Sequence, residues 1–145
     1  MTDKTLISAE ISPTNPDAKL GLEIWVDNTM IKDINPVVES VYFQTEIDDA
    51  DGEHELKFVL KNKLPEHTTI DSNGDIIADA LITISDIQFD EIRLGHPVHE
   101  LANYTHNFNG TGPYVVEPFR NSMGCNGTVS LKFTTPVYLW LLEHM

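Results

Sequence analysis

Carboxylate residues gather in two short segments whose composition suits a calcium site. The first segment, DDADGE, contains Asp48, Asp49, Asp51 and Glu53, and the second, DSNGDIIAD, contains Asp71, Asn73, Asp75 and Asp79. Calcium takes about six to eight oxygen ligands, which turns of this composition supply. Neither segment has the glycine position of an EF-hand loop, and turn preferences in an acidic protein explain both without a metal. Calcium is therefore the only cofactor considered, as the alternative to ordinary turns.

Histidine and cysteine are the other side chains with chemistry of their own. His96, His99 and His106 lie near Glu100, but their spacing fits no zinc motif, which favours solvated loop histidines. Cys125 has no adjacent base to orient it, which favours an inert thiol. No phosphate-binding glycine loop, nucleophile elbow or paired-carboxylate signature occurs, so we predict no catalytic residue and no enzyme. Carboxylates that converge only in the fold leave polysaccharide cleavage as a minor alternative.

Two aromatic residues fall on the polar phase of alternating segments. Leu22, Ile24 and Val26 alternate with Trp25, and SVYFQTEI places Tyr42 opposite its apolar set. A planar ring on an exposed strand face can stack on a sugar, although single exposed aromatics are common on ordinary surfaces. Trp25 and Tyr42 are therefore the candidate glycan-binding residues.

The charge balance and the single cysteine restrict partners and compartment. The formal net charge is −14, from 23 acidic and 9 basic residues, and such a chain repels phosphate backbones, which argues against nucleic acid. One cysteine excludes an internal disulfide. No segment reaches the roughly 18 apolar residues of a membrane span, and no secretory signal is visible at the N-terminus. We expect synthesis in a reducing cytoplasm and no membrane insertion.

Apolar residues with a period of two predict strands along most of the chain. The expected strands cover residues 20–26, 30–34, 40–47, 54–62, 79–94, 104–108 and 128–134. Asn-Gly pairs that begin at Asn73, Asn109 and Asn126 suit tight reversals. This pattern predicts an all-β fold, an antiparallel β-sandwich of jelly-roll type, as one domain over residues 1–145.

The segment DALITISDIQFDEIRL breaks its own alternation twice. Ile82 and Ile84 fall on even positions, Ile87 and Phe89 on odd positions, and Ile92 returns to even. A β-bulge adds one residue to a strand and restores the apolar side to the core. We therefore expect one bulge near residues 85–86 and a second near residue 90.

The last third of the chain contains two segments without a clear strand pattern. Residues 95–127 are rich in Gly, Asn and Pro, and a structureless loop of that length is improbable. We therefore expect one short strand within it, and the remainder either packed as an ordered excursion or held by a neighbouring molecule. The C-terminal segment is apolar on both phases, through Val137, Tyr138, Leu139, Trp140, Leu141 and Leu142. Such a segment must be covered on both sides, either as an inner strand or short helix of this domain or as an assembly interface with another subunit.

Two strands resemble those of small carbohydrate-binding modules. DGEHELKFVLKN followed by ALITISDIQFDEI is similar to a G-x-H-x-L-x-F strand and an I-x-I-x-x-I-x-F-D strand in jelly-roll modules that bind xylan with calcium. The resemblance lies within residues 20–94. It implies a β-sandwich that binds sugar through loops or a sheet face, often with calcium.

Three other segments resemble small virion structural proteins of contractile-tailed phages of marine cyanobacteria. These segments are LPEHTTIDSNGDIIAD, YTHNFNGT and NSMGCNGTVSLKFTTPVYLWLLE. The resemblance implies a particle component in the capsid decoration, neck or tail and transfers no catalytic residue. We therefore predict a non-enzymatic virion protein, made in the host cytoplasm, that assembles with itself or with other virion proteins. The alternative is a calcium-dependent module that binds host surface polysaccharide.

Overall fold

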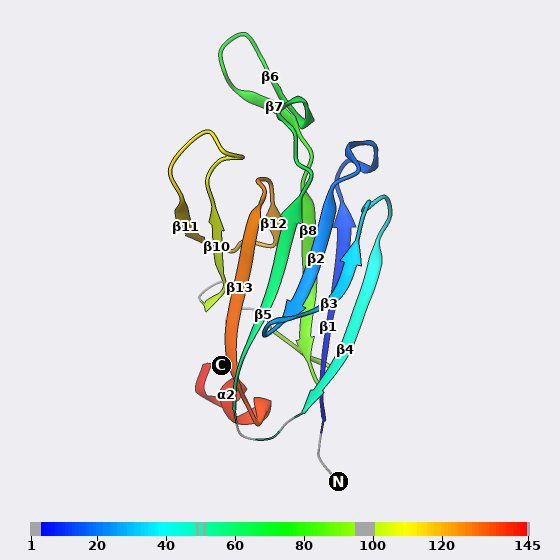
Figure 1. Cartoon of the computed structure of the whole chain (residues 1–145), viewed down its shortest axis with the longest axis vertical. Helices are drawn as coiled ribbons and strands as arrows, with labels where there is room; N and C mark the ends of the chain where they lie inside the picture. The colour runs from blue at the N-terminus through cyan, green and yellow to red at the C-terminus, as the bar shows by residue number, and fades with distance from the viewer. Residues whose placement is uncertain (1–3, 49, 51, 95–100, 145) are drawn as a thin grey trace.

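Two antiparallel sheets packed face to face form the body of the protein (Figure 1). The computed structural model describes residues 4–48, 50, 52–94 and 101–144. Sheet A has the strand order β12-β8-β1-β4, with β9 paired to β8. Its strands are β1 (Lys4–Pro13), β4 (Val41–Asp48), β8 (Ile82–Phe89), β9 (Ile92–Arg93) and β12 (Ser122–Met123).

Sheet B is the larger layer and has the strand order β11-β10-β13-β5-β2-β3. Its strands are β2 (Gly21–Val26), β3 (Thr29–Ile34), β5 (Gly52–Lys61), β10 (Asn103–His106), β11 (Val115–Pro118) and β13 (Gly127–Thr135). The chain passes repeatedly from one sheet to the other, so neighbours in each sheet are mostly distant in sequence. The predicted all-β antiparallel sandwich is confirmed.

A small third sheet and three short helical segments complete the described structure. Strands β6 (Thr68–Ile70) and β7 (Ile76–Asp79) pair only with each other. The 3-10 segments are η1 (Pro16–Ala18) and η2 (Pro65–His67), and the chain ends in helix α2 (Val137–His144). No helix among the described residues is long and apolar enough to cross a membrane.

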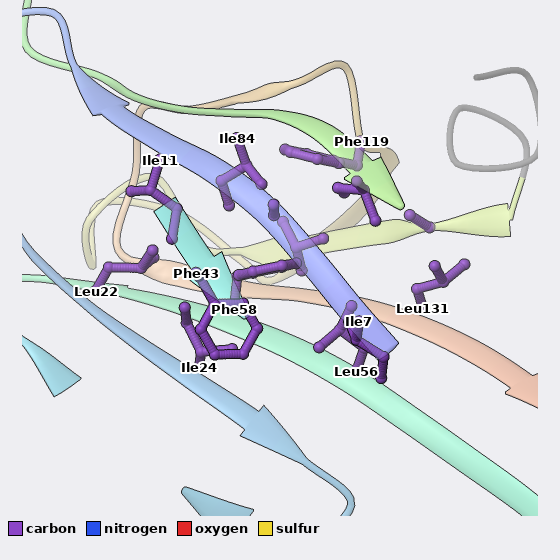
Figure 2. Packing of buried hydrophobic residues seen from close by; sticks show 14 of the residues in the cluster. Ile7, Ile11, Leu22, Ile24, Phe43, Leu56, Phe58, Ile84, Phe119 and Leu131 are labelled. Atoms are coloured by element: carbon purple, nitrogen blue, oxygen red, sulfur yellow. The ribbon is translucent and has the colours of Figure 1, made fainter. Parts of the chain in front are cut away.

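The core lies between the two sheets and is built by the period-two alternation of their strands. Figure 2 shows side chains of β1 and β8, such as Ile7 and Ile84, meeting side chains of β2 and β5, such as Ile24 and Phe58. Phe119, from the segment between β11 and β12, is fully buried with them. Alternate residues of each strand point to opposite faces, so each strand contributes one side to this core.

Strand β8 contains the first predicted bulge. Ser8 pairs with Gln88 and Glu10 with Ser85, so three steps along β8 oppose two along β1. Asp86 takes a positive φ of 51° and is exposed, while Ile87 returns to the core. The bulge near residues 85–86 is confirmed, and it restores the apolar side to the interior.

The second expected bulge is a chain reversal instead. Asp90 and Glu91, with φ of 53° and 67°, join Phe89 to Ile92, and these two residues face each other in the β8–β9 pair. Two consecutive positive φ values suit a two-residue hairpin turn. The alternation slips here because the chain turns back, so the expectation of a second bulge was wrong.

Strand β1 was not predicted, although it lies in the middle of sheet A between β8 and β4. Its buried set contains Ile7, Ala9 and Ile11 with the buried polar residue Thr5. Alanine and threonine weaken the apolar signal of an alternating segment. The pattern was present in KTLISAEISP but carried too little hydrophobicity to stand out.

Candidate functional site

An open cleft of about 630 Å³ lies where β2 ends beside β5, at the end of the sandwich that carries α2 (Figure 1). Val26, the last residue of β2, pairs with Leu56. Strand β5 extends further and stays paired with β13 up to Gly52. The cleft is lined by Asp27, Asn28, Glu53, His54, Glu55, Lys132, Phe133, Thr134, Trp140, Glu143 and His144.

Asp27 forms the wall at the end of β2. It has a φ of 56°, and with Asn28 it makes the reversal into β3. Its N–H donates to the Glu55 carbonyl at 2.8 Å, and its Oδ1 accepts the Glu55 N–H at 2.9 Å. The side chain thus replaces the backbone acceptor that a continuing strand would provide.

His54 connects this wall to the floor of the cleft. Its Nδ1 lies 2.9 Å from Asp27 Oδ2, its Nε2 lies 3.2 Å from Thr135 Oγ1, and its ring stacks on Phe133 with centroids 5.5 Å apart. Desolvation raises the pKa of Asp27, but hydrogen bonds from His54 and the Glu55 amide and the charge of Lys57 outweigh it. The pKa of Asp27 therefore lies below its ordinary value.

The order Thr135–His54–Asp27 resembles the hydroxyl–imidazole–carboxylate relay of hydrolases. The Thr135 hydroxyl donates its hydrogen to the Ala50 carbonyl, and Thr135 is only 5% exposed. Thr135 is also not among the residues that line the cleft. A nucleophile must reach the substrate, so in this geometry the three residues tie β13, β5 and the β2–β3 turn together.

Carboxylates dominate the walls of the cleft. Asp27, Glu53, Glu55 and Glu143 face it with one lysine, Lys132. The cleft therefore disfavours anionic ligands and supplies acceptors for hydroxyl or cationic groups.

Helix α2 supplies an aromatic floor. Trp140 is 4% exposed, and its ring lies 5.7 Å from Phe89 and 4.9 Å from His144, centroid to centroid. The fold thus turns Trp140 inward, and the His144 ring lies against it in the lining of the cleft. Aromatic rings at the floor and carboxylates on the walls make the cleft amphipathic.

The two predicted glycan-binding aromatics lie on different sheets. Trp25 is half-buried on the outer face of sheet B, where its Nε1 donates to Glu23 at 2.9 Å and Lys57 Nζ lies 5.8 Å from the ring centroid. Tyr42 is 65% exposed on sheet A, opposite Glu10 of β1. The predicted outward phase is confirmed for both residues, but their rings cannot form one platform.

The acidic segments are not brought together among the residues that the structure describes. Asp71 accepts the N–H groups of Asn73 and Asp75 at 2.8 and 3.0 Å, as a turn residue does. Asp79 accepts Lys63 Nζ and Thr68 Oγ1.

The first acidic segment is only partly visible. Asp48 pairs with Lys4 at 2.7 Å, whereas Asp49 and Asp51 lie outside the described residues. Within residues 4–48, 50, 52–94 and 101–144, no three His, Cys, Asp or Glu side chains are grouped to hold a metal ion. Calcium stays a prediction.

The predicted assembly residues divide into two sets. Val137, Trp140 and Leu141 are buried within this chain, so they are core residues rather than a free interface. Three others stay at the surface, with exposed fractions of 57% for Tyr138, 49% for Leu139 and 72% for Leu142. A helix that packs one side on its own domain separates the two sets by face.

His106 and Cys125 are both drawn into the fold. His106 is 4% exposed and its Nε2 lies 2.8 Å from Glu117 Oε2, so the expectation of a solvated loop histidine was wrong for this residue. Cys125 is partly buried, and burial raises the pKa of its thiol, as an inert cysteine requires. His96, His99 and Glu100 lie outside the described residues.

Sequence reasoning missed the cleft itself. Asp27 belongs to the predicted turn after residue 26, and His54 to the inward phase of a predicted strand, but nothing in the sequence links them. It also missed Tyr114, which is 74% exposed between β10 and β11. Residues 107–113, which precede Tyr114, are mostly turn residues and give no strand pattern that would assign its side chain to a face.

No protein-family model matches the chain, and no curated protein matches it significantly. Among solved structures, the chain is similar to vCBM60 in complex with galactobiose, with 13% sequence identity and a TM-score of 0.48. The match covers 87% of this chain and 96% of that chain. Galactobiose is a ligand of that protein.

Proposed function

We propose that this protein is a non-catalytic module that binds a neutral glycan in the cleft between the β2–β3 turn, β5, β13 and α2. The observation that carries the proposal is the meeting of carboxylates and aromatic rings around one open hollow of about 630 Å³. Small-molecule sites span about 300–1,000 Å³ and combine an apolar lining with a few polar groups.

The polar groups of the cleft match the chemistry of sugar hydroxyls. A hydroxyl both donates and accepts, and the cleft presents carboxylate acceptors beside donors from Asn28, Lys132 and Thr134. The C–H faces of a sugar ring are apolar and pack on exposed aromatic rings. Phe133 and Trp140 lie beneath the floor with exposed fractions of 1% and 4%, so the proposed binding rests mainly on the polar groups of the walls. The acidic walls exclude glycans that carry carboxylates or sulfates.

Calorimetry and NMR titration with neutral polysaccharides and their oligosaccharides test this function. Glu53→Gln and Glu143→Gln change exposed residues at the rim, and we expect each to weaken binding at least tenfold, about 1.4 kcal/mol. Glu46→Gln, on the outer face of sheet A, is the matched control and should bind normally. Repeating the titration with a chelator tests calcium separately.

Two results would reject the cleft. If the heat of glycan binding is unchanged in both rim variants but lost in Trp25→Ala, the binding site lies on the outer face of sheet B instead. No heat and no shift with any neutral glycan, with or without calcium, would remove glycan binding altogether.

The second candidate is the assembly role in a virion that the resemblance to phage structural proteins implies. The specific observation in its favour is the apolar surface of α2 that stays exposed, formed by Tyr138, Leu139 and Leu142. Deleting residues 136–145 would remove Trp140 and Leu141 from the core, so the test needs point variants.

Replacing Tyr138, Leu139 and Leu142 by serine tests that role without opening the core. If α2 mediates assembly, the triple variant should remain folded but lose self-association in sedimentation and incorporation into particles. Unchanged assembly would exclude this face of α2.

A further inference from the structure

A hairpin arm, residues 64–79, projects from the end of the sandwich opposite α2 (Figure 1). Its strands β6 and β7 form their own two-stranded sheet, separate from sheets A and B. Nearly all of its described side chains are at least partly exposed. An isolated two-stranded hairpin is marginally stable in water, so its shape must be held at its ends.

The base of the arm is held by a buried charge. Lys63 has a side chain with 0% exposure, and its Nζ donates to Asp79 Oδ1 and to the Ala80 carbonyl. Thr68 Oγ1 donates to the same Asp79 carboxylate at 2.7 Å, and the Ala80 N–H donates to the His67 carbonyl at 3.0 Å. Both strands are thereby joined where they leave the sandwich.

The tip of the arm is held by its own turn. The Asp71 carboxylate accepts two backbone N–H groups, from Asn73 and Asp75, and the Asp71 N–H donates to the Asp75 carbonyl at 2.9 Å. Gly74 takes a φ of 86°, which a side chain would strain. The arm is therefore preformed from base to tip.

Three isoleucines are exposed on this rigid hairpin. Ile70 faces Ile76 directly across the pair, and Ile77 is the extra residue of a bulge at that point. Their exposed fractions are 57%, 64% and 64% respectively. A bulge sets two residues of one strand against one of the other, so the register places all three isoleucines at the same point along the hairpin. Single exposed apolar residues are ordinary, whereas a group on a projecting element marks a contact surface.

The charges around the isoleucines indicate what they contact. Segment 64–79 contains four acidic residues and no lysine or arginine. Within the part of the chain that the structure describes, the neighbouring Lys63 forms its ion pair with Asp79. Glu66 and Asp75 are exposed. A second copy of this chain would bring the same acidic arm and a net charge of −14, which disfavours a contact between arms. A basic surface is the complementary partner.

We propose that the arm is a docking element that inserts Ile70, Ile76 and Ile77 into an apolar groove rimmed by lysine and arginine on a different protein. The cleft lies at the opposite end of the long axis (Figure 1). When the arm is bound to its partner, the cleft of this protein can therefore still face solvent. A preformed arm lowers the ordering cost of docking.

A displayed random-peptide library tests the chemistry of this surface. Peptides are selected for binding to the full chain. Those that also bind the Ile70→Ser/Ile76→Ser/Ile77→Ser variant are removed by counter-selection. We expect enriched peptides that combine Lys or Arg with apolar residues. Their affinity should fall at least tenfold for the triple variant and fall as salt is raised. Tyr138→Ser/Leu139→Ser/Leu142→Ser, which removes the exposed apolar surface of α2, is the matched control and should bind normally.

Two further measurements keep the test independent of folding. Glu66→Gln/Asp75→Asn should weaken binding and reduce its salt dependence. The variant should stay folded, because the turn is held by the Asp71 side chain and, among the described residues, no hydrogen bond or ion pair of the Glu66 or Asp75 side chain contributes to it. Hydrogen exchange of the unmodified protein should show protection of amides 68–79 when a selected peptide is added. The proposal would be overturned if no peptide survived selection, or if the surviving peptides lacked basic residues. Protection from hydrogen exchange outside residues 68–79 would overturn it as well. Self-association that depends on the arm would assign the surface to a second copy instead.

Discussion

His54 Nδ1 lies 2.9 Å from Asp27 Oδ2, and this contact joins a hairpin turn to the edge of the neighbouring strand. The same carboxylate accepts the Glu55 N–H at 2.9 Å. Asp27 thus closes the end of β2 and shapes one wall of the cleft. The stability of the fold and the geometry of the proposed site depend here on one side chain.

Replacing Asp27 with asparagine should lower the free energy of unfolding by about 1 kcal/mol at neutral pH, since a half-exposed carboxylate is screened by water. The pKa of Asp27 is depressed, so its contribution is present above pH 3.8, the ordinary value, and is lost as the pH falls below it. Urea unfolding between acid and neutral pH should show the two proteins converging in acid. Asp17→Asn, on exposed η1, is the control and should change the free energy of unfolding little at neutral pH. A stability difference between Asp27→Asn and the unmodified protein that stays constant from neutral to acid pH would contradict this role.

Replacing Lys63 with methionine should destabilise the fold by about 3 kcal/mol, because it leaves the Asp79 carboxylate and the Ala80 carbonyl without their buried donor. Hydrogen exchange should rise first in residues 68–79, the arm whose base Lys63 holds. Lys4→Met breaks the exposed pair with Asp48 and should change stability little. Equal effects of the two substitutions, measured by denaturant unfolding, would show that the buried ammonium has no special role.

Replacing Asp86 with valine should destabilise the protein by about 1–2 kcal/mol, because a β-branched residue does not tolerate the φ of 51° at the β8 bulge. Asp86→Gly should keep or raise the melting temperature, since glycine adopts this φ freely and the lost contact with Arg93 is exposed. Gln44→Val, on an exposed position of β4, controls for strand propensity. Thermal unfolding that ranks valine above glycine at position 86 would refute the bulge.

Replacing Tyr104 with phenylalanine should cost about 1–3 kcal/mol, because the hydroxyl donates to the Cys125 carbonyl and accepts the Cys125 N–H at 2.8 Å. Burial raises the pKa of Tyr104 well above its ordinary value of 10.0. Its contribution is therefore complete below pH 10.0 and declines as the pH rises and the unfolded state ionises. Denaturation curves of the two proteins should converge in alkali. Tyr114→Phe, at a 74% exposed position, should leave stability unchanged.

Most strands were predictable because their signal is local. Alternation placed Phe58 and Leu60 inward, set Trp25 and Tyr42 outward, and revealed the bulge at Asp86. Strand β1 was not predicted, because Ala9 and Thr5 on its inner face make its alternation only weakly apolar. The arm escaped because the apolar residues around DSNGD face water, where alternation gives no buried side to detect.

The C-terminal segment shows the limit of a local pattern. Its apolar residues predicted coverage on both sides, and the structure covers one side with the domain's own core through Trp140. The other side, with Leu142, stays exposed. Which side is buried depends on how α2 packs beyond β13, and nothing within the segment itself determines that.

The sequence by itself determined the sheet architecture, because each strand's two faces are encoded in consecutive residues. Only the tertiary structure decided the cleft. Asp27 and His54 lie 27 positions apart and meet because β2 ends beside β5, while His144 joins them from a helix at the other end of the chain. Strand pairing sets such distances, and pairing depends on the packing of the whole sandwich rather than on spacing along the chain.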